Sequence, residues 1–174
     1  EIHAAHGYLI HQFMSPLIND RTDDYGGSFD NRIRFLLEIV AAVKQEISEQ
    51  SLWVRVSGTD WAEGGWTLEE TVKLSQILKE QGVEVMDISS GGAVAHQKID
   101  PKPNYQVFLA EEVKKQANTI TGAVGIITSG KQAEALLQEQ KADLILVGRA
   151  FLADPHFPLR AAHELGVQVF RSAY

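Results

Sequence analysis

The segment SLWVRVSGTDWAEGGWTLEETVKLSQILKEQGVEVMDISSGG, residues 51–92, contains two short apolar runs separated by a helical pattern. The runs at 51–58 and 83–92 are rich in Val and other apolar residues and predict strands. Between them, TLEE at 67–70 is a capping box that predicts a helix start, and Gly82 predicts the end of that helix. A strand, a helix and a second strand in this order predict a parallel βαβ unit with a right-handed crossover.

The same alternation continues on both sides of this unit. Towards the C-terminus, 122–127 and 142–149 predict two more strands, and LILVG is nearly continuous in apolar residues, as expected of a parallel strand covered on both faces. At the other end, EIH at 1–3 is interpreted as the end of a further strand. Helices are predicted after Ser28, which suits an N-cap, and over 104–117, 129–140 and 156–165.

Four full strands and the end of a fifth, each followed by a helix, amount to about half of a (β/α)8 barrel, which needs about 250 residues. We therefore predict an α/β fold that is the C-terminal half of a TIM barrel, a single partial domain over 1–174 running from the end of strand 4 to helix 8. An open doubly wound sheet is the alternative, but the first strand-to-helix turns lack the G-x-G-x-x-G pattern of dinucleotide-binding sheets. Glu1 lies inside an apolar phrase, so we interpret the chain as part of a longer protein whose N-terminal half is absent here.

The composition argues against several classes of function. The formal net charge is −7, which disfavours binding to nucleic acid or to an anionic membrane. No apolar run approaches the roughly 20 residues of a membrane span. The chain has no cysteine, so it can form no disulfide, thiolate nucleophile or cysteine metal site. The same absence is compatible with a cytoplasmic protein, which is our expectation.

Two histidines, His3 and His6, stand three residues apart at the end of the first strand. By type and spacing they could bind zinc, fill the core or donate hydrogen bonds to a substrate. Zinc would need a third and usually a fourth ligand, and nothing in the sequence recruits one. We therefore predict no metal and leave the other two interpretations open at this point.

The last two strand ends are rich in glycine, and active groups gather at the C-terminal ends of strands in parallel barrels. GAVGIITSG carries Gly125, and LILVGRAF carries Gly148 and Arg149. Loops in this position often bind phosphate through backbone N–H groups, and an arginine there can bind a phosphate bidentately. The competing interpretation is that the glycines only make turns and Arg149 forms a surface ion pair.

Arg55 lies within the strand sequence WVRVS, on the same face as Trp53 and Ser57 by alternation. A buried arginine needs a counter-charge, because an unpaired buried charge is costly. Asp87 and an electron-rich ligand are the two candidates for that partner.

Four segments in the right order resemble the old yellow enzyme family of flavin-dependent ene-reductases. They are HAAHGYL, SPLINDRTDDYGGSFDNRIRF, VRVSG and GRAFLADP. The pattern N-x-R-T-D-x-YGGS-x-x-NR is long and specific, and the His/His version of the first segment resembles the thermophilic-like NADPH dehydrogenases. The resemblance implies a (β/α)8 barrel that binds FMN, takes hydride from NADPH or NADH, and reduces an activated alkene or a quinone-like acceptor.

The resemblance also implies roles for individual residues. His3 and His6 would hydrogen-bond the carbonyl or phenolic oxygen of the acceptor, with Ala4 and Ala5 in the same substrate-binding stretch, and Tyr8 would be the proton donor. Arg55 would lie near N1 and O2 of the flavin. Gly148 and Arg149 would bind the phosphate, with Ser89 and Gly125 as weaker neighbours.

The YGGS stretch is expected to be structural, with Asp20, Arg21, Asp23 and Arg32 available for ion pairs. We expect a homo-oligomer, in which Arg171 is a candidate to reach a neighbouring subunit, and we expect the isolated 174 residues to be inactive. Two other functions remain open: an isomerase or aldolase barrel with a phosphate substrate, and a non-catalytic fragment of the flavoenzyme. The physiological acceptor and the choice between NADPH and NADH are not determined by the sequence.

Overall fold

The computed structural model describes residues 1–168, which form a parallel five-stranded sheet in the order β1-β2-β3-β4-β5. The strands are β1 (Ile2–Ala4), β2 (Trp53–Ser57), β3 (Val85–Ser89), β4 (Ile120–Ala123) and β5 (Leu144–Ile145). Neighbours in the sheet are also neighbours in the sequence, and each pair is parallel. A doubly wound sheet would reverse its strand order at a switch point. The uninterrupted order is therefore that of half a (β/α)8 barrel, as predicted.

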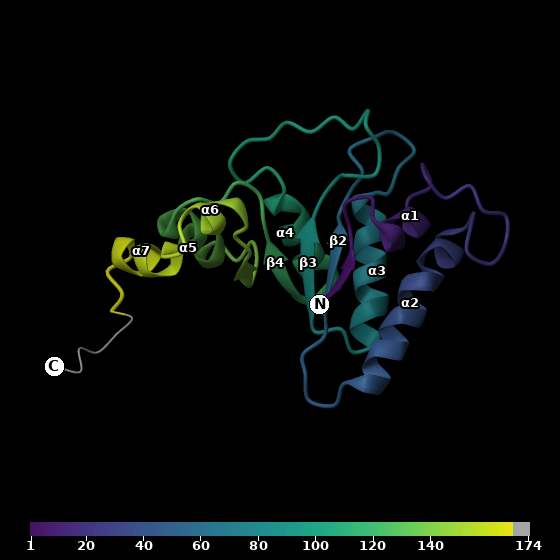
Figure 1. Ribbon diagram of the computed structural model, residues 1–174, viewed down its shortest axis with the longest axis horizontal. Coiled ribbons are helices and arrows are strands. Elements are labelled where there is room, and N and C mark those ends of the chain that lie inside the picture. Colours follow the sequence, from purple (N-terminus) through teal and green to yellow (C-terminus); the bar gives the residue numbers. More distant parts are fainter. Residues whose placement is uncertain (169–174) are drawn as a thin grey trace.

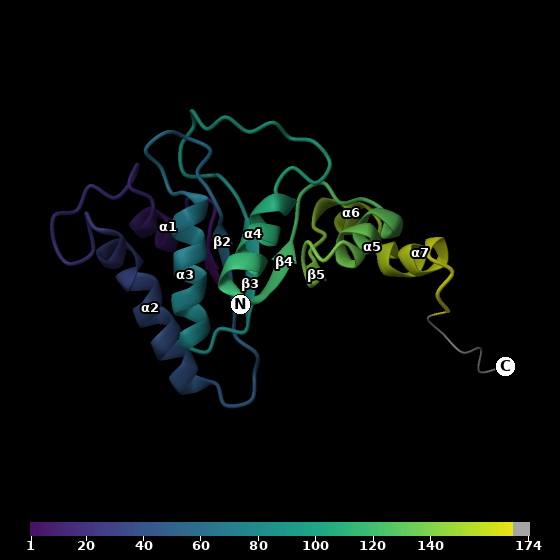
Figure 2. The same ribbon diagram turned by 180° about the vertical axis from the view of Figure 1, so that it is seen from behind.

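The helices cover one face of this sheet. They are α1 (Leu9–Met14), α2 (Phe29–Glu46), α3 (Leu68–Glu80), α4 (Val107–Ala117), α5 (Gly130–Gln138), α6 (Arg149–Ala153) and α7 (Phe157–Glu164). Figure 1 shows β3 in front of α4, and Figure 2, from behind, shows α3 and α4 in front of the strands. Within residues 1–168, no helix combines the length and the apolar character needed to cross a membrane.

The hydrophobic core lies between the sheet and the helices. Alternate strand residues point towards the helices and are fully buried, among them Val54 and Val56 of β2 and Ile88 of β3. They pack with Leu36, Leu74 and Leu109 of the helices. Burying each such side chain contributes about 1.5–3 kcal/mol, so this layer is a main source of stability.

The other face of the sheet carries a polar row. The register aligns His3 with Arg55, Arg55 with Asp87, and Asp87 with Gly122. Because side chains alternate along a strand, these residues point away from the helix layer that buries Val54 and Ile88. Parallel pairing therefore brings together a histidine, an arginine and a carboxylate that are far apart in the sequence.

Three helix boundaries are confirmed. Ser28 caps α2 by accepting a hydrogen bond from the Asn31 backbone N–H. Thr67 and Glu70 form the predicted capping box of α3. Gly82, with φ +83°, follows the end of α3, where a side chain would strain the left-handed backbone.

Several predicted boundaries are wrong. The fourth strand was expected at 122–127 but spans Ile120–Ala123, and the chain then turns through Gly125 and Ile126, which have positive φ angles. The fifth is paired only at Leu144 and Ile145, so Arg149 begins α6 and does not end a strand. The helices α1 and α6 were not predicted, because runs of five or six residues carry too little periodicity to be recognised.

The YGGS segment is held to the helices by Arg32, which is buried at the start of α2. Its guanidinium donates to the carbonyl oxygens of Met14 and Gly27 and pairs with the carboxylate of Glu70. Arg21 pairs with Asp23 on the surface. Arg32 thus joins this loop to α1 and α3, whereas the Arg21 pair is exposed and contributes little.

We predict that Arg32→Ala lowers the free energy of unfolding of the intact protein by about 3 kcal/mol, because it leaves the buried Met14 carbonyl oxygen and the partly buried Glu70 carboxylate without their donor. Arg34→Ala is the matched control two residues along α2, where the side chain is exposed; its loss should stay below about 0.5 kcal/mol. Urea denaturation measures both. Equal losses in the two variants would contradict the assignment of a joining role to Arg32.

Candidate functional site

A cavity of about 620 Å³ lies at the C-terminal ends of the strands. Its lining comes from the turn after β1, the strands β2 and β3, the start of α4, and the loops after β4 and β5. The polar residues in the lining include His6, Arg55, Ser89, Gln106, Thr128 and Arg149. This volume falls within the range of about 300–1,000 Å³ that is usual for small-molecule sites.

His6 enters this cavity from the turn that follows β1. Its backbone is left-handed, with φ +57°, and its N–H donates to Ser57 Oγ at 2.9 Å. The ring nitrogen Nε2 lies 2.7 Å from Ser89 Oγ. Ser89, which the resemblance places near a phosphate, is therefore in direct contact with the histidine.

His3 and Tyr8 lie beside His6. The ring centroid of His3 is 5.4 Å from that of His6 and 5.5 Å from that of Tyr8. Both residues are exposed, and neither belongs to the lining of the cavity itself. The structure thus brings together the three ring side chains that the sequence indicated as candidate site residues.

Ala4 and Ala5 have no exposed surface, in contrast to the histidines on either side of them. Ala4 belongs to the hydrophobic core, aligned with Val56 on the helix-facing side of the sheet. Their side chains are buried and do not line the cavity, and the expectation that this stretch binds substrate stays a prediction. Alternation along β1 explains the burial of Ala4, since His3 and Ala4 point to opposite faces, whereas Ala5 lies just beyond the strand.

Both candidate histidines are held neutral. Burial lowers the pKa of His6 to about 4, and the positive charge of Arg55 adds to this effect. Burial and Arg55 also lower the pKa of His3. Each imidazole consequently offers one N–H donor near neutral pH without carrying a charge.

Arg55 lies close to Asp87 without a good hydrogen bond between them. Arg55 Nε is 3.3 Å from Asp87 Oδ2, but the geometry leaves both atoms without a hydrogen-bond partner among residues 1–168. Burial raises the pKa of Asp87 to about 7, although Arg55 acts in the opposite direction. Asp87 is therefore the nearby counter-charge that the sequence suggested, but it is a weak one, and the guanidinium remains available to a ligand in the cavity.

The glycine-rich ends behave differently from one another. Gly148 and Arg149 line the cavity, and a Cβ added at Gly148 would meet no atom of residues 1–168 within 4 Å. Gly125 is not in the lining, and its carbonyl oxygen accepts a hydrogen bond from the Asn104 N–H at 2.8 Å. Arg149 is exposed at the start of α6. The phosphate interpretation therefore rests mainly on Gly148 and Arg149, and the weaker roles of Ser89 and Gly125 stay predictions.

Sequence reasoning missed the apolar part of the lining and also Tyr105 and Gln106, which precede α4. Gln106 is buried, precedes α4 and accepts a hydrogen bond from Ser90 Oγ. A polar residue at the first turn of a helix that follows a strand was the available signal, because such a turn lies at the same edge of the sheet. Within residues 1–168, no group of three or more His, Asp or Glu side chains is placed to hold a metal ion.

Comparisons with known proteins identify the relatives of this chain. Residues 1–168 match the model of the NADH:flavin oxidoreductase / NADH oxidase family. An NADPH dehydrogenase of Bacillus pumilus (strain SAFR-032) is 53% identical over 169 residues, which are 97% of this chain and 49% of that protein. The chain thus spans about half the length of the relatives that it matches.

Two solved structures are also similar. A 2-naphthoyl-CoA reductase in complex with 2-naphthoyl-CoA is 28% identical, with a TM-score of 0.84 over 95% of this chain and 26% of that one. Morphinone reductase is 26% identical, with a TM-score of 0.73 over 97% of this chain and 44% of that one. Both similarities extend over nearly the whole of the present chain.

We predict that His6 stays uncharged until the pH falls to about 4. The pKa of an unperturbed histidine is 6.5, so between these values the unfolded state binds more protons than the folded state. The free energy of unfolding should therefore fall as the pH falls through this window, and less so in His6→Asn. Urea denaturation of both proteins at several pH values measures the difference. An NMR titration that gives His6 an ordinary pKa would refute the prediction.

Proposed function

The chain belongs to the NADH:flavin oxidoreductase / NADH oxidase family, that of old yellow enzyme, and on this premise we propose the activity of the full-length protein. The full-length protein is, on this proposal, an FMN-dependent NAD(P)H oxidoreductase that reduces activated alkenes such as enones. The observation that carries the proposal is the pair of neutral imidazoles, His3 and His6, beside Arg55. An isomerase or aldolase with a phosphate substrate would use Gly148 and Arg149 but would need none of these three side chains.

The residues of the cavity fit FMN. Among the described residues 1–168, the buried Nε atom of Arg55 has no hydrogen-bond partner, which suits the electron-rich edge of the flavin ring. The open space at Gly148, next to Arg149, suits a phosphate. Leu146 and Val147 add apolar surface to the lining. Arg55 would thus hold the ring, and Gly148 and Arg149 would hold the phosphate.

Bound FMN would supply the hydride chemistry that links NADPH or NADH to the electron-poor alkene. Negative charge then develops on the carbonyl oxygen of the acceptor, and fixed N–H donors stabilise such a charge. His3 and His6 supply these donors, and their lowered pKa values keep them neutral, so no buried positive charge has to be maintained. Tyr8 is the proposed proton donor to the alkene, from its place beside His3.

Arg55 supplies the permanent positive charge of the site. Because the pKa of Asp87 is raised to about 7, a large share of Asp87 carries a proton at neutral pH and cancels little of that charge. A cation at the electron-rich edge of a flavin favours its reduced form. The weak pairing of Arg55 with Asp87 thus supports a role in cofactor binding rather than in structure alone.

The remaining expectations concern the whole protein. We propose that this chain supplies the part of the barrel from the end of strand 4 to helix 8, and that an N-terminal half completes the site. The isolated 174 residues would then lack activity. Assembly into a homo-oligomer stays a prediction, and Arg171, the candidate for contact with a neighbouring subunit, lies outside the described residues.

We predict that Arg149→Ala weakens FMN binding to the full-length apoenzyme by about tenfold, the loss of one charge-assisted hydrogen bond worth about 1.5 kcal/mol. Arg160→Ala is the control, because Arg160 lies on α7 outside the cavity and pairs with Asp154 and Glu164. Equilibrium dialysis measures the two affinities. Unchanged affinity in Arg149→Ala would remove its phosphate role.

We predict that His3→Ala and His6→Ala each slow enone reduction in the full-length enzyme by more than about tenfold, because each removes a donor to the developing oxyanion. Reduction of the flavin by NADPH should suffer less. Stopped-flow measurement of the two half-reactions separates these effects, and equal losses in both would count against a substrate-specific role. Added zinc should leave the activity unchanged.

A further inference from the structure

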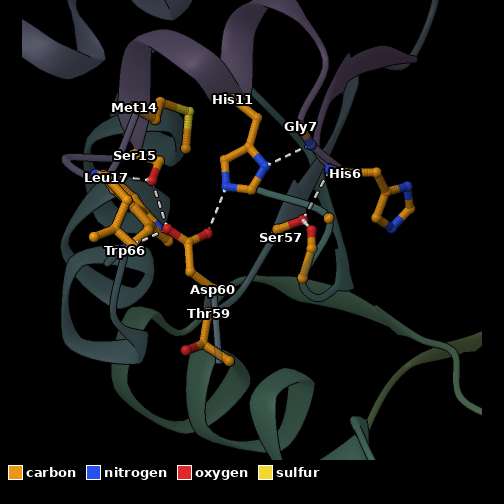
Figure 3. Close-up of polar contacts among 12 residues, drawn as sticks. His6, Gly7, His11, Met14, Ser15, Leu17, Ser57, Thr59, Asp60 and Trp66 are labelled. Atoms are coloured by element: carbon orange, nitrogen blue, oxygen red, sulfur yellow. Dashed lines mark hydrogen bonds and ion pairs between the residues drawn. The ribbon is translucent and has the colours of Figure 1, made fainter. Parts of the chain in front are cut away.

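A fully buried polar cluster lies beside the turn that carries His6, and the proposed reaction does not use it (Figure 3). It consists of His11 on α1, Ser15 at the end of α1, and Asp60 in the loop after β2. None of the three belongs to the lining of the cavity. Buried polar side chains are costly unless they are fully hydrogen-bonded, so their arrangement calls for a physical account.

The hydrogen bonds of His11 define its tautomer. The Gly7 backbone N–H donates to His11 Nδ1 at 2.9 Å, so Nδ1 must carry a lone pair. The proton of the neutral ring is therefore on Nε2, which lies 2.9 Å from Asp60 Oδ1 and donates to it. A charged imidazolium would place a hydrogen on Nδ1 against the Gly7 N–H.

Asp60 is the fixed end of this arrangement. Its carboxylate also accepts hydrogen bonds from Ser15 Oγ at 2.6 Å and from the Trp66 backbone N–H at 2.8 Å. Burial alone would raise the pKa of Asp60, but the bonds from His11, Ser15 and Trp66 bring it below its ordinary value. Asp60 is consequently an anchored anion that orients the His11 ring. Carboxylates that accept from a ring N–H orient functional histidines in the same way in many proteins.

The other end of the arrangement is the strained turn. His6 and Gly7 have φ angles of +57° and +75°, and a left-handed non-glycine residue costs about 1–3 kcal/mol unless its surroundings hold it. A Cβ on Gly7 would lie 2.2 Å from the Gly92 carbonyl oxygen, so the turn packs directly against the loop after β3. The bond from the Gly7 N–H to His11 holds the residue immediately after His6.

We propose that His11 is a positioning residue for the reaction, acting through His6. Anchored by Asp60, it holds the Gly7 N–H and so keeps the His6 ring directed at Ser89 and the cavity. The inference rests on the proposed role of His6 as a donor to the acceptor oxygen. Loss of His11 would let the turn relax, which affects steps that involve the acceptor and spares transfer of hydride from NADPH to the flavin.

The test uses the full-length FMN-loaded enzyme and three variants. His11→Leu fills the buried space but cannot accept from Gly7, whereas His11→Gln restores an acceptor and a donor on one side chain. Thr71→Val is the matched control: Thr71 is equally buried, donates to the Gly58 carbonyl oxygen and accepts from the Trp66 indole N–H. It lies on α3 and, among residues 1–168, makes no hydrogen bond to the turn. The readouts are cyclohexenone reduction, flavin reduction by NADPH, and the dissociation constant of 4-hydroxybenzaldehyde from absorbance titration.

We expect His11→Leu to weaken binding of the phenol 4-hydroxybenzaldehyde by about tenfold and to slow cyclohexenone reduction by about tenfold. Flavin reduction by NADPH should change by less than about twofold. His11→Gln should recover most of the loss. Thr71→Val should lower thermal stability and leave all three readouts near wild type. A loss in His11→Leu no larger than in Thr71→Val, or spread equally over both half-reactions, would overturn the inference.

Two further variants sharpen the test. If His11 acts through His6, adding His11→Leu to His6→Ala should slow cyclohexenone reduction little further, and additive losses would contradict this.

Ser15→Ala keeps His11 and removes one hydrogen bond to Asp60, so it tests the anchor should His11→Leu fail to fold. We expect about a threefold loss in phenol binding, and no loss would refute the anchor. If wild type neither binds the phenol nor reduces cyclohexenone, the proposed function fails instead.

Discussion

Parallel pairing of β1, β2 and β3 in a single register is the constraint on which the site depends. It aligns His3 with Arg55 and Arg55 with Asp87, so that three side chains from distant parts of the sequence share one face of the sheet. The same pairing turns the alternate residues towards the helices, where they form the core. A slip of one residue in either pair would exchange the two sets. Stability and site geometry are therefore set by the same hydrogen bonds.

Charge within this row follows from burial. Arg55 is the permanent cation, and its field together with desolvation keeps His3 and His6 neutral. Asp87 is too deeply buried to remain a full counter-ion at neutral pH. The result is a site with one cation, neutral donors and little compensating negative charge, which suits an electron-rich ring and an acceptor that gains negative charge.

Buried hydrogen bonds support the turn that carries His6. Asp60, His11 and the Gly7 N–H form a buried series of hydrogen bonds that ends at the turn carrying His6. Arg32 joins the adjoining loop to α1 and α3 in a similar way. The first 14 residues thus act as one unit: they contain the end of β1, the strained turn at His6 and Gly7, and the short helix α1 that supports the turn.

Local pattern and motif order were sufficient to predict the alternation of strands and helices, the capping of α2 by Ser28 and of α3 by Thr67, and the family. The sequence also indicated His3, His6 and Arg55 as candidate site residues. Three positions could be found only in the folded chain: Ala4 lies in the core, Gly125 lies outside the cavity, and His11 bonds Asp60 across 49 residues of chain. Pairing between strands and burial arise from segments distant in sequence, so no local pattern records them.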